Sequence, residues 1–144
     1  MINTEDIIVA CSSPPGSGAI SCIRVSGKNC SKLFKKISGK KMVHREAAIC
    51  EIHLEHGLTE KCVLTSFVSP NSYTGEDVIE ISCHGNPLIV ELIISKLNSL
   101  GCRNAEPGEF TMRSYLNEKI SLVEAETIAD IISAETYEKL KTIN

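Results

Sequence analysis

Two charged residues stand inside stretches that are otherwise apolar, a setting in which a charge needs a partner or a ligand. Glu80 lies in the middle of the alternating run 78–83, and Arg24 lies near the end of the β-rich run 19–25. In an extended strand each would share a face with uncharged neighbours, where an unpaired charge is costly. We therefore expect each of these charges to be paired with another residue or with a ligand. The simpler interpretations are a solvent-facing sheet residue for Glu80 and a strand-end salt bridge for Arg24.

A further group of polar residues lies in the segment 107–119, which reads PGEFTMRSYLNEK. Its Pro-Gly pair predicts a turn, and a short helix is expected to follow. Two cations and an amide would then lie close to two aromatic rings; the residues are Phe110, Arg113, Tyr115, Asn117 and Lys119. Rings give a flat apolar surface on which polar groups can orient a planar anionic ligand. The alternative is a capped surface helix.

The strands and helices that would position these residues are interspersed along the first 105 residues. Alternation and β-branched residues predict strands near 7–10, 19–25, 47–56, 61–69 and 78–83, with a short one at 102–105. Apolar residues at helical spacing predict helices near 28–37 and 87–100. Gly57 marks a hairpin between the third and fourth strands. We therefore expect an α+β domain with a mixed or antiparallel sheet covered by two helices.

The last part of the chain predicts a helical unit. Ser121 and Glu124 have the spacing of a capping box, and an apolar stripe follows at helical spacing. We expect one helix of about 20 residues, or about 30 Å. The outer side of this helix needs apolar cover beyond a lone N-terminal domain; the residues are Ile131, Tyr137, Leu140 and Ile143. The predicted organisation is a first domain over 1–119 and the start of a helical domain over 120–144.

Charge and composition bound the class of protein. The 144 residues are 42% hydrophobic and 23% charged, which is typical of a globular protein, and the net charge is −3. That balance argues against a free-standing nucleic-acid binder. Seven of the fifteen Lys and Arg residues lie between 28 and 45. This run predicts a solvated helix face and loop; the alternative is a weak footprint for nucleic-acid phosphate.

Several kinds of site and location are not expected. Seven cysteines without a C-x-x-C pair predict reduced, buried thiols and no metal site. The motif G-x-x-x-x-G-K-[ST] does not occur, so no nucleotide is expected to bind in the P-loop manner. No apolar run approaches the roughly 20 residues of a membrane span. Residues 1–10 show no signal pattern, so a cytoplasmic location is expected.

Three segments resemble one known protein family. They are PPGSGAISCIRVSG at 14–27, PNSYTGEDVIEISCHGNP at 70–87 and PGEFTMRSYLNEK at 107–119. Their order and spacing are similar to those of the tRNA modification GTPase family MnmE, also called TrmE, and the resemblance covers essentially the whole chain. Members of that family are much longer. The resemblance therefore implies their N-terminal domain plus the start of a following helix.

A folate site is what the resemblance implies for this domain. The family binds 5-formyl- or 5,10-methylene-tetrahydrofolate in a domain similar to the folate-binding domain of the glycine-cleavage aminomethyltransferases. Its ligand-binding positions match Arg24, Glu80 and Lys119. A carboxylate can accept the N–H and the exocyclic NH₂ of a pterin side by side, and either cation can neutralise the glutamyl tail. Further pocket residues are expected among Tyr73, His84, Phe110, Arg113, Tyr115 and Asn117.

The sequence departs from the family pattern at three positions. His-Gly-Gly is replaced by HGN at 84–86, and because Asn86 tolerates positive φ we expect the turn to survive. Glu118 adds a carboxylate next to Lys119, and Ser121 replaces the usual Asp but can still cap a helix. None of these changes removes a predicted ligand-binding residue.

At the level of function, the resemblance implies one part of a larger enzyme. Full-length members carry a GTPase domain that uses GTP, Mg and K, and they form homodimers through the N-terminal domain. With an FAD-dependent partner of the MnmG type they add an aminomethyl-type group to C5 of the wobble uridine in tRNA. The 144 residues contain no GTPase element, so we expect no catalytic residue here and no GTP hydrolysis by this chain alone.

Three other functions stay open at the level of sequence. A purely structural dimerisation module would keep the fold with a vestigial folate pocket. An independent folate-dependent enzyme resembling the methyltransferases would need an amine site and a general base, for which only His84 and Glu80 are candidates. An RNA-binding module would depend on the lysines at 28–41 and would oppose the negative net charge.

Overall fold

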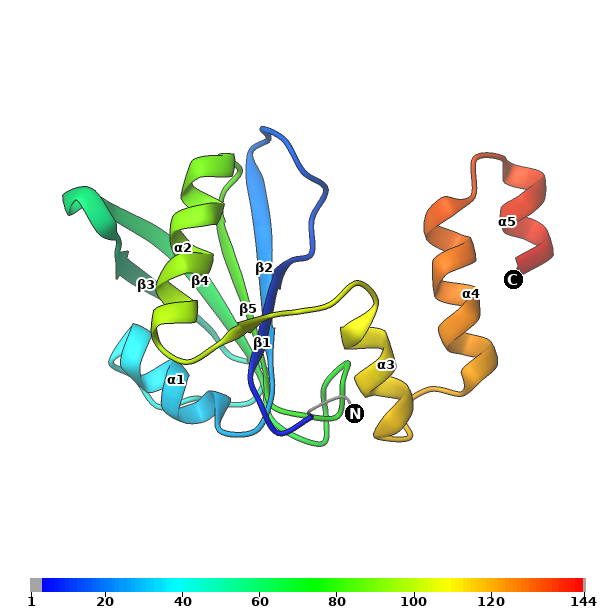
Figure 1. Ribbon diagram of the computed structural model, residues 1–144, viewed down its shortest axis with the longest axis horizontal. Helices are drawn as coiled ribbons and strands as arrows, with labels where there is room; N and C mark the ends of the chain where they lie inside the picture. Colours follow the sequence, from blue (N-terminus) through cyan, green and yellow to red (C-terminus); the bar gives the residue numbers. More distant parts are fainter. Residues whose placement is uncertain (1–3, 144) are drawn as a thin grey trace.

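A six-stranded mixed sheet forms the body of the protein in the computed structural model, which describes residues 4–143 (Figure 1). The strands are β1 (Ile8–Cys11), β2 (Ile20–Ser26), β3 (Ala47–His53), β4 (Thr59–Phe67), β5 (Val78–His84) and β6 (Arg103–Asn104). Their order is β3-β4-β5-β2-β1-β6, and only the β1–β6 pair is parallel. A 3-10 turn, η1 (Glu55–Gly57), closes the predicted hairpin between β3 and β4. The mixed sheet is confirmed.

Two helices cover one face of this sheet, as their apolar spacing predicts. They are α1 (Cys30–Ser38) and α2 (Pro87–Ser99), and they lie on the same side of the strands (Figure 1). Phe34 of α1 and Leu97 of α2 pack into one core with inward residues of the strands. Full burial of such a side chain stabilises the fold by roughly 1.5–3 kcal/mol. This core fixes the strands that carry the predicted site.

The opposite face of the sheet is largely open and carries the predicted charges. Arg24 lies opposite Glu80, and Glu80 lies opposite Thr65, so all three share a face. Ile20 and Ile49 lie on the same face and are 70% and 62% exposed. The mid-strand position of Glu80, inferred from the alternation of 78–83, is therefore confirmed.

The junction between β5 and α2 differs from what the sequence predicted. Asn86 does not adopt positive φ; its φ is −113°, and its side chain caps α2 by accepting a hydrogen bond from Leu88 N. Capping explains the Asn, since its amide oxygen satisfies a backbone N–H that the helix leaves unpaired. Gly85 is the position that requires glycine, because a Cβ there would lie 2.3 Å from the carbonyl oxygen of Gly18.

Three short helices follow the sheet: α3 (Glu109–Leu116), α4 (Leu122–Ser133) and α5 (Tyr137–Ile143). The predicted capping box of α4 is confirmed, with Ser121 and Glu124 bonded in both directions. The prediction of a single helix of about 20 residues is wrong. Ala134 is extended, with ψ 125°, and Thr136 starts α5 by accepting a hydrogen bond from Lys139 N. A hydroxyl that caps a new helix competes with continuation of the old one.

All seven cysteines are free, and five of them are buried, as expected of small apolar side chains. Burial raises the pKa of the Cys62 thiol to about 12 and that of the Cys102 thiol to about 11. Such thiols are inert at neutral pH. Within residues 4–143, no helix is long and apolar enough to cross a membrane.

Candidate ligand site on the open sheet face

The two charged residues singled out in the sequence meet on neighbouring strands. Arg24 Nε and Nη2 donate to Glu80 Oε1 at 3.2 and 3.0 Å. The side chains are 25% and 29% exposed, so the pair is neither buried nor fully solvated. Glu80 Oε2 and Arg24 Nη1 make no hydrogen bond to any residue within 4–143. The pair therefore keeps one acceptor and one donor for a ligand.

Two aromatic rings flank the guanidinium of this pair. Arg24 Cζ lies 5.0 Å from the ring centre of Tyr73 and 5.8 Å from that of Phe110, within range of a cation–π interaction. Tyr73 comes from the loop between β4 and β5, and Phe110 comes from the first turn of α3. Tyr73 is held in place by α3, since its hydroxyl contacts Thr111 Oγ1 at 2.9 Å and its carbonyl accepts from Ser114 Oγ at 2.6 Å.

Lys119 borders a hollow of about 390 Å³ beside the pair. The lining residues are Arg45, Phe67, Asn71, Ser72, Tyr73 and Lys119. Tyr73 thus belongs both to the hollow and to the wall around Arg24. Phe67 is two residues along β4 from Thr65, which lies opposite Glu80, so the hollow opens on the same face of the sheet. A single ligand placed on the pair can extend toward Lys119.

The structure places three other predicted pocket residues away from the pair. His84 is at the far end of β5, about 13 Å along the strand from Glu80, and its Nδ1 lies 2.7 Å from Glu60 Oε1. Tyr115 is exposed on α3 and lines an apolar groove against α4. Asn117 Nδ2 donates to the carbonyl of Thr74, which fixes the loop that carries Tyr73.

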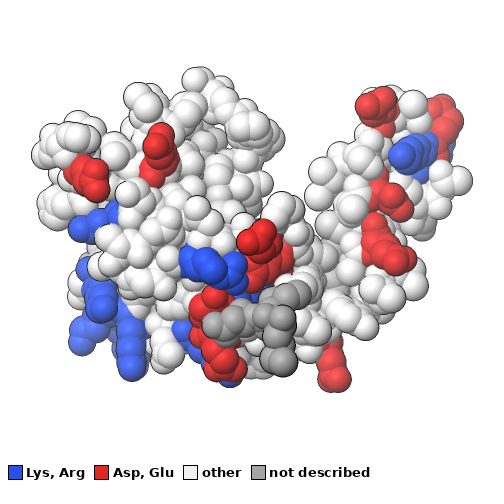
Figure 2. All heavy atoms as spheres, in the orientation of Figure 1, with Lys and Arg blue, Asp and Glu red and all other residues white. Residues whose placement is uncertain are grey.

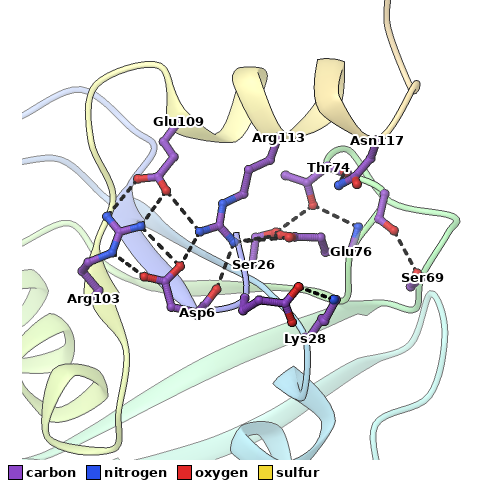
Figure 3. Close-up of polar contacts among 12 residues, drawn as sticks. Asp6, Ser26, Lys28, Ser69, Thr74, Glu76, Arg103, Glu109, Arg113 and Asn117 are labelled. Carbon is purple, nitrogen blue, oxygen red and sulfur yellow. Dashed lines mark hydrogen bonds and ion pairs between the residues drawn. The ribbon is translucent and has the colours of Figure 1, made fainter. Parts of the chain in front are cut away.

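Arg113 lies at the centre of a buried group of charges under α3, which we call the ionic cluster (Figure 3). Its Nη2 contacts Asp6 Oδ1 at 2.6 Å and Glu109 Oε1 at 3.1 Å, and its Nη1 contacts Glu76 Oε1 at 3.2 Å. Arg103 bridges Asp6 and Glu109, with both contacts at 2.6 Å. The Arg113 side chain is completely buried. It joins α3 to the segment before β1 and to the loop before β5.

The members of the ionic cluster keep one another ionised. A hydrogen bond from Arg103 lowers the pKa of Glu109 to about 2, although burial acts in the opposite direction. The same arginine lowers the pKa of Asp6. Burial disfavours the charged form of Arg113, but the hydrogen bond to Asp6 and the charge of Glu76 hold its pKa above the ordinary value. The cluster therefore positions Tyr73 and Phe110 through α3 and the loop, and Arg113 serves as an internal support.

Known proteins share the segments that build this site. A family profile described as "GTP-binding protein TrmE N-terminus" matches residues 7–119. The chain belongs to the TrmE family, whose members are also called MnmE. The protein named tRNA modification GTPase MnmE from Francisella philomiragia is 42% identical over 139 residues, which cover 96% of this chain. The proteins of that name from Francisella tularensis subsp. holarctica and subsp. novicida are 42% identical over 133 residues, which cover 92%.

The TrmE match covers the whole candidate site. It reaches Lys119, directly after α3, and so includes every side chain around the Arg24–Glu80 pair and the hollow. Helices α4 and α5 lie beyond it. The chain spans about a third of the length of these curated MnmE relatives, 31% of the first and 30% of the other two.

Sequence analysis missed the carboxylates that hold α3 in place. Glu109 precedes Arg113 by four residues, a spacing that predicts an ion pair on a helix and was a usable signal. Asp6 had no such signal, because 107 residues separate it from Arg113. Glu76 lies in the TGED segment and was visible only as part of a resemblance.

Proposed function

We propose that this chain is the tetrahydrofolate-binding and dimerising N-terminal part of a tRNA modification GTPase. The ligand is 5-formyl- or 5,10-methylene-tetrahydrofolate, and Arg24, Glu80 and Lys119 hold it. The observation that carries the proposal is the Arg24–Glu80 pair itself. The pair is part-exposed and flanked by two rings, and Glu80 Oε2 accepts no hydrogen bond from Arg24. A saturated, buried pair would have no group left for a ligand.

The chemistry of the site fits a folate from one end to the other. A pterin is flat and presents two donors side by side, and Glu80 Oε2 is free to accept from them while the ring packs near Tyr73 and Phe110. The glutamyl tail carries carboxylates, and Lys119 stands at the hollow into which the tail would extend. When bound, tetrahydrofolate supplies the one-carbon unit of the reaction. The chain's own residues orient it and neutralise its charge.

Dimerisation is proposed through this same domain. Ile20, Ile49 and Val63 are exposed on the open sheet face that also carries the Arg24–Glu80 pair. Apolar side chains gathered on a face beside a ligand site are typical of an interface between subunits. We expect a homodimer in sedimentation experiments at micromolar protein. A monomer at all concentrations up to the millimolar range would contradict this part of the proposal.

The relatives' name, tRNA modification GTPase, supports a proposal for the activity of the whole protein. We propose that the full-length protein works in the cytoplasm with an FAD-dependent partner of the MnmG type. Together they add an aminomethyl-type group to C5 of the wobble uridine in tRNA. GTP, Mg and K act in a GTPase domain, and the 144 residues contain no P-loop motif. This chain alone is therefore expected not to hydrolyse GTP.

A second candidate function is a structural dimerisation module in which the pocket no longer binds folate. One observation favours it: Glu80 already has an internal partner in Arg24, so the pair is satisfied in part without a ligand. This candidate keeps the fold, the family and the dimer. It differs from the proposal in a single measurable property, the affinity for tetrahydrofolate.

Calorimetric titration with 5-formyltetrahydrofolate tests the proposal. The parent chain is expected to bind, and Glu80→Gln is expected to bind about 30- to 1000-fold more weakly. The substitution removes the charge and one acceptor and turns an amide donor toward the ligand's donors, a loss on the order of 2–4 kcal/mol. Absence of binding to the parent chain would favour the structural module instead.

Glu51→Gln is the matched control for this titration. Glu51 is an exposed carboxylate of β3 and lies on the same sheet face as Glu80, opposite Lys61. It has no contact with the Arg24 pair or with the hollow beside Lys119. The control variant should bind 5-formyltetrahydrofolate as the parent does. Equal losses in the two variants would show a general charge effect and would remove Glu80 as the pterin anchor.

A further inference from the structure

Positive charge is concentrated on α1 and the turn that follows it. Residues 28–45 contain seven Lys and Arg residues and no Asp or Glu, whereas the rest of the chain has eight cations against eighteen acids. Figure 2 shows this segregation as blue atoms gathered at the lower left, over α1, and red atoms along α4 and α5. An even distribution would have placed acids among these lysines. Positive charge is therefore concentrated in residues 28–45 and negative charge in the rest of the chain, although the net charge is only slightly negative.

The fold holds these lysines outward. Cys30, Leu33 and Phe34 of α1 are buried in the core, which fixes the rotation of the helix about its axis. The outward residues form what we call the basic surface: Lys32, Lys35, Lys36, Lys40 and Lys41, all exposed. Within residues 4–143 no carboxylate pairs with any of these side chains, and only the Lys40 side chain makes a hydrogen bond, from Nζ to the carbonyl oxygen of Ile49. Lys28 is different, because it pairs with Glu5.

Helix stability explains only part of this arrangement. Lys35 and Lys36 lie in the last turn of α1, where cations interact favourably with the helix dipole. That effect fades within one turn, so it leaves Lys32 in the first half of the helix and Lys41 beyond its end unexplained. The cation-rich segment 28–45 ends at Arg45, which lines the hollow beside Lys119. Positive charge thus continues from α1 to the edge of the proposed folate site.

We infer that the basic surface binds the phosphate backbone of tRNA and brings the RNA to the folate-bearing domain. This inference rests on the proposed function, in which tRNA is the substrate of the full-length protein. The surface offers lysines and no exposed aromatic ring, which suits phosphates and not bases, so the contact is independent of nucleotide sequence. The acidic remainder of the chain repels RNA, and binding is therefore confined to this one side.

Fluorescence anisotropy with a labelled, unmodified tRNA transcript tests the inference in 25–150 mM KCl. The triple variant Lys32→Ala, Lys35→Ala, Lys36→Ala is expected to bind at least about tenfold more weakly than the parent at the lowest salt. The slope of log K against log salt should fall by about 2–3, since each lost phosphate contact removes about 0.7–0.9. A Lys→Arg triple at the same positions should retain the parent affinity and slope.

The matched control removes the same charge elsewhere, as Lys61→Ala, Lys96→Ala, Lys139→Ala on β4, α2 and α5. These lysines are exposed and lie outside both the basic surface and the folate site. The control should stay within about twofold of the parent. Equal losses of tRNA affinity in the two triple variants would overturn the inference. A parent chain that binds no tRNA at 25 mM KCl would also overturn it, whether or not that chain binds phosphatidylserine vesicles.

A folate titration of the same proteins separates this inference from the proposed function. The basic-surface triple should bind 5-formyltetrahydrofolate with unchanged affinity, because its residues do not line the Lys119 hollow. Loss of tRNA binding with intact folate binding supports the basic surface. Intact tRNA binding in the basic-surface triple, with normal folate affinity, refutes the basic surface and leaves the folate proposal standing.

Discussion

Two arginines of this chain pair with carboxylates in opposite surroundings. Arg113 is completely buried and contacts Asp6, Glu76 and Glu109 within the ionic cluster. Arg24 is one-quarter exposed, contacts a single carboxylate and faces two rings. In the first arrangement both terminal nitrogens of the guanidinium donate to groups inside the protein, and in the second only one terminal nitrogen does so within residues 4–143. Exposure and the number of internal partners, and not residue type, separate a structural arginine from one that is available to a ligand.

The two arginines should therefore fail in different ways when they are altered. Loss of a group from the ionic cluster leaves buried charges unpaired, which destabilises the fold. Loss of a group from the Arg24–Glu80 pair leaves a part-exposed charge that water can solvate, at a cost of at most about 1 kcal/mol. Ligand affinity should show the reverse order. The following changes test this contrast, from the largest expected effect to the smallest.

Arg113→Met should produce the largest loss of stability. The three carboxylates around it would lose their central partner, and breaking a buried pair in this way costs about 3–5 kcal/mol. Urea unfolding at pH 7 measures the loss. The control is Arg45→Met, which removes an exposed arginine outside the cluster and should change the free energy of unfolding by less than about 0.5 kcal/mol. Equal losses in the two variants would show that the cluster does not support the fold.

Acid should weaken the same cluster. The pKa of Glu109 is lowered from 4.5 to about 2 in the folded protein, so its stabilising contribution is complete above pH 4.5 and is lost as the pH falls toward 2. The difference corresponds to on the order of 3 kcal/mol. Urea unfolding at pH 7, 4 and 2.5 should show the decline. Constant stability over this range would contradict the role of the cluster.

Lys119→Ala should weaken the ligand site with little effect on the fold. Lys119 is exposed at the hollow, so its removal costs charge attraction to the glutamyl tail, on the order of 1 kcal/mol or about fivefold to tenfold in affinity. A pterin analogue without the tail should bind the variant and the parent alike. Calorimetry with both ligands makes the distinction. A loss that is equal for the two ligands would place Lys119 at the pterin end.

The sequence predicted most of the sheet because each strand carries its own alternation. It also placed Glu80 in mid-strand, and the register puts Arg24 directly opposite. It did not separate Arg113 from Arg24, because burial depends on partners such as Asp6 that are remote in the chain. The break between α4 and α5 was missed for a local reason, since Thr136 gives an alternative helix start inside a continuous apolar stripe. Strands and helices follow from local patterns and were predictable. How many internal partners each charged side chain has depends on residues remote in the chain, and only the three-dimensional structure shows it.

Thermal melting of the parent and of Glu80→Gln, each with and without 5-formyltetrahydrofolate at about 100 times the parent's Kd, tests the contrast most directly. Without ligand the two proteins should melt within about 2 °C of each other, because a part-exposed pair adds little stability. Ligand at this level stabilises the parent by about 2.7 kcal/mol, or roughly 5–10 °C. Glu80→Gln should show little or none of that rise. An equal rise in both proteins, or a ligand-free loss above about 5 °C in Glu80→Gln, would show that the pair serves the fold and not a ligand.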